Sequence, residues 1–121
     1  MTSPSEIQWL AGLLEGEGCF HGYRGKYANP KVQLVMTDSD VVERAAKIMD
    51  VSSTKQKHIT LGGKNIYRAN VYGPHAVGWM MTLYPLMGQR RKAKIRECLE
   101  KWRSGPNRPC MKKYHARHGG N

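Results

Sequence analysis

Two glutamates, Glu15 and Glu17, stand two residues apart in the stretch WLAGLLEGEGCF, between glycines and directly after an apolar run. A helix over that run places both carboxylates at its C-terminal end, where the helix dipole disfavours negative charge. Carboxylate oxygens are ligands for Mg²⁺, which keeps several waters and takes only one or two carboxylates from a protein. Such an ion can neutralise a phosphate and activate water in phosphodiester hydrolysis. The pair is therefore a candidate site for a divalent metal ion.

The net charge indicates the kind of partner. The chain has 20 Lys and Arg residues against 9 Asp and Glu residues, a formal charge of +11 over 121 residues. A small basic domain favours a polyanionic partner, most often nucleic acid, although ribosomal proteins, membrane-surface binders and simple basic tails share this charge. We expect double-stranded DNA as the partner, with no membrane and no small-molecule substrate. The sequence has no apolar run of membrane-spanning length and no signal-peptide pattern, so we expect a cytoplasmic protein. Three cysteines at irregular spacing do not suggest a disulfide framework.

The elements that would position the two glutamates can be predicted from capping residues and hydrophobic periodicity. Ser3, Pro4 and Glu6 match an N-cap, a first helical position and a capping box, and an apolar stripe follows them. Strands are expected at residues 19–27, 31–37, 53–60 and 65–72, with turns at 28–30 and 61–64. The other helices are expected after the capping run 37–40 as far as residue 49, at 75–84 and at 90–102.

This order is α-β-β-α-β-β-α-α, which predicts an α/β (α+β) fold with one antiparallel sheet and its helices on one face. Residues 1–104 are expected to form a single domain. Residues 105–121 are basic and rich in Gly and Pro, and we expect a flexible tail there.

One face of the predicted sheet is polar. In the last strand Tyr67, Ala69 and Val71 alternate with polar neighbours, and Phe20 belongs with the apolar set. Side chains of the polar kind suit base edges and phosphates in a DNA groove. The residues expected to contact DNA are Cys19, His21, Tyr23, Arg24, Lys26, Lys31, Gln33, Lys55, Lys57, Lys64, Arg68, Asn70 and Tyr72.

The segment Leu10-Ala11-Gly12-Leu13-Leu14-Glu15-Gly16-Glu17-Gly18 resembles the signature of the LAGLIDADG homing endonucleases. Five of its nine positions are identical to that signature, and the other four are conservative replacements. The resemblance implies the family's α-β-β-α-β-β-α core, with an antiparallel sheet that forms a saddle over DNA. Because the chain has one such motif, it implies the single-motif type, a homodimer that cuts both strands of a near-palindromic site.

The resemblance also assigns roles to individual residues. It implies that Ala11, Gly12 and Gly16 are the close-contact positions between two copies of the first helix. Glu17 and the Gly16 carbonyl would bind catalytic Mg²⁺ or Mn²⁺, while Glu15 would have a capping or supporting role. The family places a basic residue near the scissile phosphate before its last helix, and here Arg90 or Arg91 would serve.

Two other functions on the same scaffold remain open. The chain could be a DNA-binding regulator that does not cleave, or an RNA-splicing maturase. Both acidic positions are present, which argues against the regulator, because a protein that only binds gains nothing from carboxylates facing phosphates. The target sequence cannot be read from the chain.

Overall fold

The structure is a computed structural model that describes residues 2–24, 27–56 and 65–104. A short 3-10 helix separates the last two helices, and otherwise the order is the predicted α-β-β-α-β-β-α-α. In chain order the elements are α1 (Pro4–Glu17), β1 (Gly18–Arg24), β2 (Tyr27–Met36), α2 (Ser39–Met49), β3 (Ser53–Gln56), β4 (Ile66–Tyr72), α3 (Gly73–Leu83), η1 (Tyr84–Leu86) and α4 (Gln89–Ser104).

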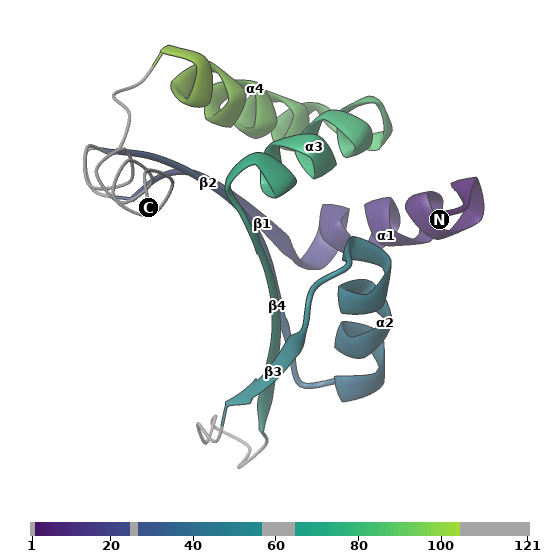
Figure 1. The fold of residues 1–121 in the computed structure, drawn as a ribbon. Helices are drawn as coiled ribbons and strands as arrows, with labels where there is room; N and C mark the ends of the chain where they lie inside the picture. The colour runs from purple at the N-terminus through teal and green to yellow at the C-terminus, as the bar shows by residue number, and fades with distance from the viewer. Residues whose placement is uncertain (1, 25–26, 57–64, 105–121) are drawn as a thin grey trace, which may run out of the picture.

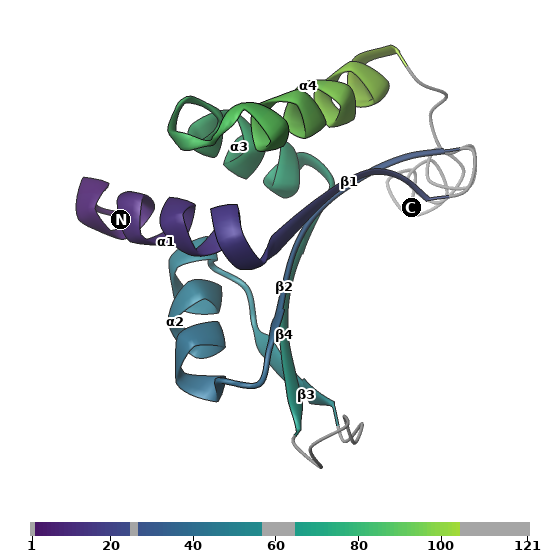
Figure 2. The same ribbon diagram turned by 180° about the vertical axis from the view of Figure 1, so that it is seen from behind.

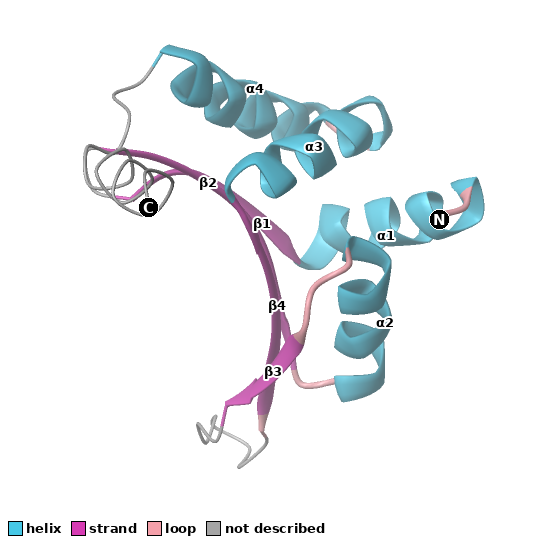
Figure 3. Ribbon diagram, viewed as in Figure 1, coloured by secondary structure: helices cyan, strands magenta, loops and turns pink. Residues whose placement is uncertain are grey.

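The four strands form one antiparallel sheet in the order β1-β2-β4-β3. The sheet is strongly curved, and α1, α2, α3 and α4 all lie on its convex side (Figures 1 and 3). In the described part of the chain no helix covers the concave side. The predicted fold class, including helices on one face, is therefore confirmed. None of the helices described is long and apolar enough to cross a membrane.

The core lies between the convex face of the sheet and the helices. Val32, Leu34 and Val71 are at most 1% exposed, because alternate residues of a strand point to the same side. Leu10 and Leu14 of α1 are fully buried in the same cluster. The other helices contribute Val42, Met49, Met80, Leu83 and Ile95.

The predicted capping residues of α1 and α2 differ in whether they make capping hydrogen bonds. Ser3 and Glu6 form the predicted capping box, in which the Glu6 N–H donates to Ser3 Oγ at 3.2 Å and the Ser3 N–H donates to Glu6 Oε1 at 2.9 Å. Asp38 stands at the N-cap position of α2, but its side chain makes no capping hydrogen bond. The first helix therefore begins with its donors satisfied, whereas α2 relies on its buried face.

The expected turn at 28–30 is wrong. β1 ends at Arg24 and β2 begins at Tyr27, so Pro30 lies inside a strand. The register shifts here, because Gly22 faces two residues, Asn29 and Pro30, between the pairs on either side. Proline is tolerated in sheets at such bulges, where its missing N–H breaks no ladder bond. The bulge explains why a turn signal in the sequence did not produce a turn.

The other differences are at element ends. The third helix begins two residues earlier than expected, and the fourth extends to Ser104. Strand β3 is described only as far as Gln56, so the expected strand residues 57–60 and turn 61–64 lie outside the described residues. The tail at 105–121 also lies outside them.

Candidate functional site

The predicted acidic end of the first helix is the junction between α1 and β1. Glu17 is the last residue of α1, and the Gly18 N–H closes the helix on the Leu14 carbonyl. A Cβ atom on Gly18 would lie 2.9 Å from the Leu14 oxygen and 2.7 Å from Leu14 Cδ2, closer than side chains approach one another. Glycine at this position therefore allows the helix to pass directly into the strand (Figure 2).

The two glutamates have different surroundings. Glu17 is exposed, and among the described residues its carboxylate has no hydrogen-bond or ion-pair partner. The Glu15 carboxylate, in contrast, accepts a hydrogen bond from the Gly88 N–H at 2.6 Å. Gly88 immediately precedes α4, so Glu15 joins the end of α1 to the start of the last helix. Of the two carboxylates, Glu17 is thus the one without a partner among the described residues.

Arg91 contacts the backbone on both sides of Glu17. Its Nε donates to the Glu15 carbonyl at 3.1 Å, and its Nη1 donates to the Gly18 carbonyl at 2.5 Å. The side chain is 14% exposed, and its Nε is 4.0 Å from Glu15 Oε2. Arg90, next to it in the sequence, is exposed. The two arginines predicted together near the reaction site therefore face different surroundings.

The last carbonyls of a helix lack intrahelical partners. In α1, Leu14 receives the Gly18 N–H and Glu15 receives Arg91. The Gly16 carbonyl accepts no hydrogen bond from the described residues. A free carbonyl oxygen thus lies next to the free Glu17 carboxylate in the sequence. Within residues 2–24, 27–56 and 65–104, the end of α1 included, no group of three His, Cys, Asp or Glu side chains gathers to hold a metal ion.

The glycines of α1 lie on its outer side. Gly12 and Gly16 are exposed, and a Cβ added to either would meet nothing within 4 Å. Gln8, one turn earlier, is also exposed. Ala11 was expected on the same contact surface, but it is 4% exposed and packs in the chain's own core. The open face of α1 therefore comprises Gly12 and Gly16 without Ala11.

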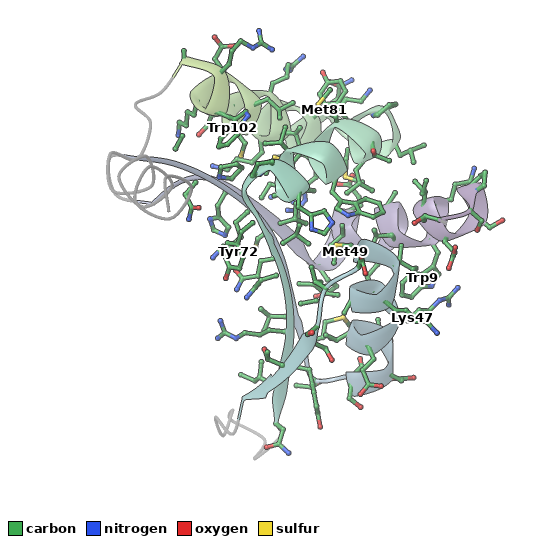
Figure 4. The ribbon with its side chains drawn as sticks, viewed as in Figure 1. Trp9, Lys47, Met49, Tyr72, Met81 and Trp102 are labelled. Carbon is green, nitrogen blue, oxygen red and sulfur yellow. The ribbon has the colours of Figure 1, made fainter. Side chains whose placement is uncertain are left out.

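The concave face of the sheet carries rows of polar side chains across paired strands. One row is His21, Lys31 and Tyr72, and the next is Cys19, Gln33 and Asn70. Cys19, His21 and Tyr72 are exposed, with Tyr72 52% exposed on the side away from the helices (Figure 4). Because the neighbouring positions in these strands are buried against the helices, the predicted division of the sheet into an apolar and a polar face is confirmed for β1, β2 and β4.

Arg68, paired with Val35 and Thr54, forms a third row of this face. In the described part of the chain, the buried side-chain polar atoms without a hydrogen-bond partner are Arg68 Nε and Asn70 Oδ1. A buried polar atom left unpaired is costly. The concave face of the isolated chain therefore keeps unused hydrogen-bonding capacity at two adjacent positions of the same face.

The other residues expected to contact DNA are placed less fully. Tyr23 and Arg24 belong to β1 and pair with Ala28 and Tyr27. Lys55 pairs with Tyr67 in the register of β3 and β4. Because residues 55–58 are polar at every position, their alternation gave no register. Lys26, Lys57 and Lys64 lie outside the described residues.

His21 on the concave face is partly buried and lies near two lysines. Partial burial, followed by repulsion from Lys31 and Lys94, holds the pKa of His21 below its usual value, and a hydrogen bond with Gln33 acts in the opposite direction. At neutral pH His21 is therefore a neutral imidazole among cations.

The contacts of Gly88 and Arg91 with α1 are the part of this site that the sequence did not reveal. The residues that meet here are separated by 73 to 76 positions in the sequence. A local sequence pattern cannot predict a contact between positions so far apart. Glu15, for which a capping or supporting role was expected, accepts a hydrogen bond from Gly88, and that role stays a prediction.

Comparison with known proteins places the fold. A crystal structure of the homing endonuclease I-CvuI, in complex with the I-CreI target in the presence of Mg and with the DNA not cleaved, is similar to this chain with a TM-score of 0.56. The two share 17% sequence identity over 83% of this chain and 69% of that one. No protein-family model matches the sequence, and no curated protein matches it. The fold is thus similar to that of the LAGLIDADG homing endonucleases.

Proposed function

We propose that this protein is a site-specific DNA endonuclease that hydrolyses both strands as a homodimer with a divalent metal. The observation that carries the proposal is the free Glu17 carboxylate, which lies where α1 runs into β1, an edge strand of the sheet whose concave face is polar and carries no described helix. The similarity of the fold to a homing endonuclease solved on DNA supports it. The charge of +11 supports a polyanionic substrate.

Glu17 and the Gly16 carbonyl are the proposed metal ligands. Both are oxygens, which Mg²⁺ and Mn²⁺ prefer, and neither is engaged by another described residue. The bound metal would activate a water molecule and neutralise the scissile phosphate. Of the two arginines expected near that phosphate, the exposed Arg90 is the one whose side chain is free to approach it.

The concave face is the proposed DNA-contacting surface. His21, Lys31 and Tyr72 in one row, and Gln33 and Asn70 in the next, are suited to phosphates and base edges. Arg and Asn are the side chains that make paired hydrogen bonds with guanine and adenine in the major groove. Arg68 and Asn70 are therefore the proposed base-reading residues, because each has an unpaired polar atom.

The second copy would pack on the open face of α1. Helices approach most closely where side chains are absent, and Gly12 and Gly16 leave that face bare. An interior helical glycine costs about 1 kcal/mol relative to alanine. Two exposed ones in the same helix are therefore unfavourable for an isolated chain and are explained by contact with a partner.

The test begins with selection of cleaved sites from a random duplex library, followed by cleavage assays on a selected site. Glu17→Gln should abolish cleavage in Mg²⁺ and Mn²⁺ and leave DNA affinity in EDTA within about twofold, because one exposed oxygen is replaced by an amide. Glu43→Gln removes the same charge from an exposed position on α2 and should cleave as the wild type does. Cleavage retained by Glu17→Gln would contradict the metal assignment.

Two other outcomes would point to the alternative functions. Tight sequence-specific binding without cleavage by the wild type in any metal would indicate a regulator. Preferential binding of intron RNA over duplex DNA in a competition assay would indicate a maturase. A stable monomer on DNA in sedimentation would contradict the symmetric double-strand cut.

A further inference from the structure

Three hydrogen bonds hold the end of α1 to the start of α4. Arg91 donates to the Glu15 carbonyl at 3.1 Å and to the Gly18 carbonyl at 2.5 Å, and the Gly88 N–H donates to Glu15 Oε1 at 2.6 Å. We refer to Glu15, Gly88 and Arg91 as the α1–α4 clamp. The two carbonyls that Arg91 binds lie on either side of Gly16 and Glu17. The clamp therefore fixes the backbone that carries the free carboxylate.

Arg91 of the clamp also offsets negative charge at the C-terminal end of α1. The C-terminal end of α1 carries two glutamates and the negative end of the helix dipole, and its last turn has no basic residue. Arg91 brings a positive charge from another helix to this end, with Nε 4.0 Å from Glu15 Oε2. Its side chain is only 14% exposed, so solvent weakens this interaction less than it would at an open surface.

The geometry separates the two glutamates. The Glu15 carboxylate, 41% exposed, accepts the Gly88 N–H through Oε1 and has Arg91 Nε 4.0 Å from Oε2, so it already has partners within the chain. Glu17 stands between the two carbonyls that Arg91 holds, and no described residue binds its carboxylate. The planar guanidinium of arginine donates to the two carbonyls in fixed directions, whereas the compact ammonium of lysine sits on a flexible stem and would hold them less rigidly.

We propose that Arg91 is a positioning residue, which together with Glu15 sets the metal affinity of Glu17 by fixing the end of α1. The inference rests on the proposed metal role of Glu17. It gives the two arginines separate tasks: Arg91 acts through the backbone of α1, and Arg90 is left to contact the phosphate. Partners that orient a metal ligand alter metal affinity or activity by about 10- to 100-fold when they are mutated.

The experiment compares Arg91→Lys, Glu15→Gln and Glu17→Gln with wild type. Mn²⁺ binding is followed by water-proton relaxation, which does not depend on cleavage, and DNA affinity is measured in EDTA. Arg96→Lys is the matched control, because Arg96 lies on the same helix, is exposed and, among the described residues, donates a hydrogen bond only to the Tyr84 hydroxyl, at 3.2 Å. All variants are compared well below their melting temperatures.

For Arg91→Lys we expect the Mn²⁺ concentration at half-saturation to rise by about tenfold or more, with DNA affinity within about twofold. Cleavage at saturating Mn²⁺ should recover to within about threefold of wild type, because the ligand itself is intact. Arg96→Lys should leave Mn²⁺ binding unchanged. A purely structural role for Arg91 would lower the melting temperature without moving the metal midpoint, and that result would overturn the proposal.

Glu15→Gln tests the same idea if Arg91→Lys does not fold. Glutamine keeps an oxygen for the Gly88 N–H, so Glu15→Gln should still bind Mn²⁺, with half-saturation at a higher Mn²⁺ concentration than in the wild type. Glu17→Gln should abolish Mn²⁺ binding. Loss of binding in Glu15→Gln as complete as in Glu17→Gln would make Glu15 a ligand and overturn the clamp. If the wild type binds DNA but no Mn²⁺, both the proposed function and the role of the clamp are overturned. If the wild type binds Mn²⁺ and Arg91→Lys binds it equally well, only the role of the clamp is overturned.

Discussion

Substitution of Gly12 by alanine should affect the single chain and the homodimer in opposite directions. In the single chain a Cβ atom at this position meets nothing within 4 Å, so the methyl group causes no clash. Alanine in a helix interior is favoured over glycine by about 1 kcal/mol, because glycine loses more backbone entropy on folding. In a domain of this size that gain corresponds to a rise in melting temperature of about 4 °C.

In the proposed dimer the same methyl group would occupy the closest approach of the two α1 helices. Overpacking costs about 1–3 kcal/mol per site, and a twofold axis applies the cost twice. The dimer dissociation constant should therefore rise by about 30-fold or more. Ala93→Gly, the reverse change at an exposed position of α4, should lower stability by about 1 kcal/mol and leave the dissociation constant unchanged.

Analytical ultracentrifugation and thermal melts over a range of protein concentrations measure both effects. The melting temperature of the wild type should depend on protein concentration, as expected when association stabilises the fold. The melting temperature of Gly12→Ala should depend less on concentration, and at high dilution it should exceed that of the wild type. A variant that is more stable yet dimerises as tightly as the wild type would refute the placement of Gly12 at the interface. A variant less stable at high dilution would refute the open space observed around it.

Three further changes test other parts of the structure. Gly18→Ala should lower the free energy of unfolding by about 2 kcal/mol or more in denaturant titrations, because its Cβ would lie 2.9 Å from the Leu14 carbonyl; an unchanged midpoint would contradict the tight junction. The pKa of His21 in the folded chain is lowered from 6.5, so the unfolded chain binds this proton more readily. The free energy of unfolding should therefore fall as the pH drops through 6.5 and below. His21→Gln should show a smaller fall between pH 8 and pH 5 in the same titrations, and an equal fall would mean that other groups cause it. Lys31→Ala should weaken DNA binding and make the slope of log affinity against log salt shallower by about 0.9 per subunit if Lys31 neutralises one phosphate, and an unchanged slope would place Lys31 off the DNA.

Local patterns predicted most of the architecture. The alternation of Val32 and Leu34 with polar neighbours identified the buried face of β2, because one residue in two of a strand points to the core. Ser3, Pro4 and Glu6 located the start of α1, because capping is decided within one turn. The same locality explains the error at Pro30, since whether proline makes a turn or sits in a bulge depends on the facing strand.

The candidate site was predicted only in part, for a different reason. The sequence indicated that Glu15 and Glu17 differ, but their environments depend on Gly88 and Arg91, which are more than 70 residues away in the chain. Ala11 illustrates the same limit. Its small side chain suggested a contact between helices, and the structure places it in the chain's own core. Spacing along a helix gives the faces, whereas tertiary packing decides which face is covered.

The exposed thiol of Cys19 is a site on the concave face that can be chemically labelled. Cys19 is exposed on the concave face, whereas the Cys98 thiol is buried against Gly22 and burial raises its pKa. Alkylating reagents attack the thiolate, so they distinguish the two positions in the folded chain without any engineered cysteine. Peptide mass mapping of Cys19 alkylation, with and without duplex DNA, therefore yields a footprint of the concave face.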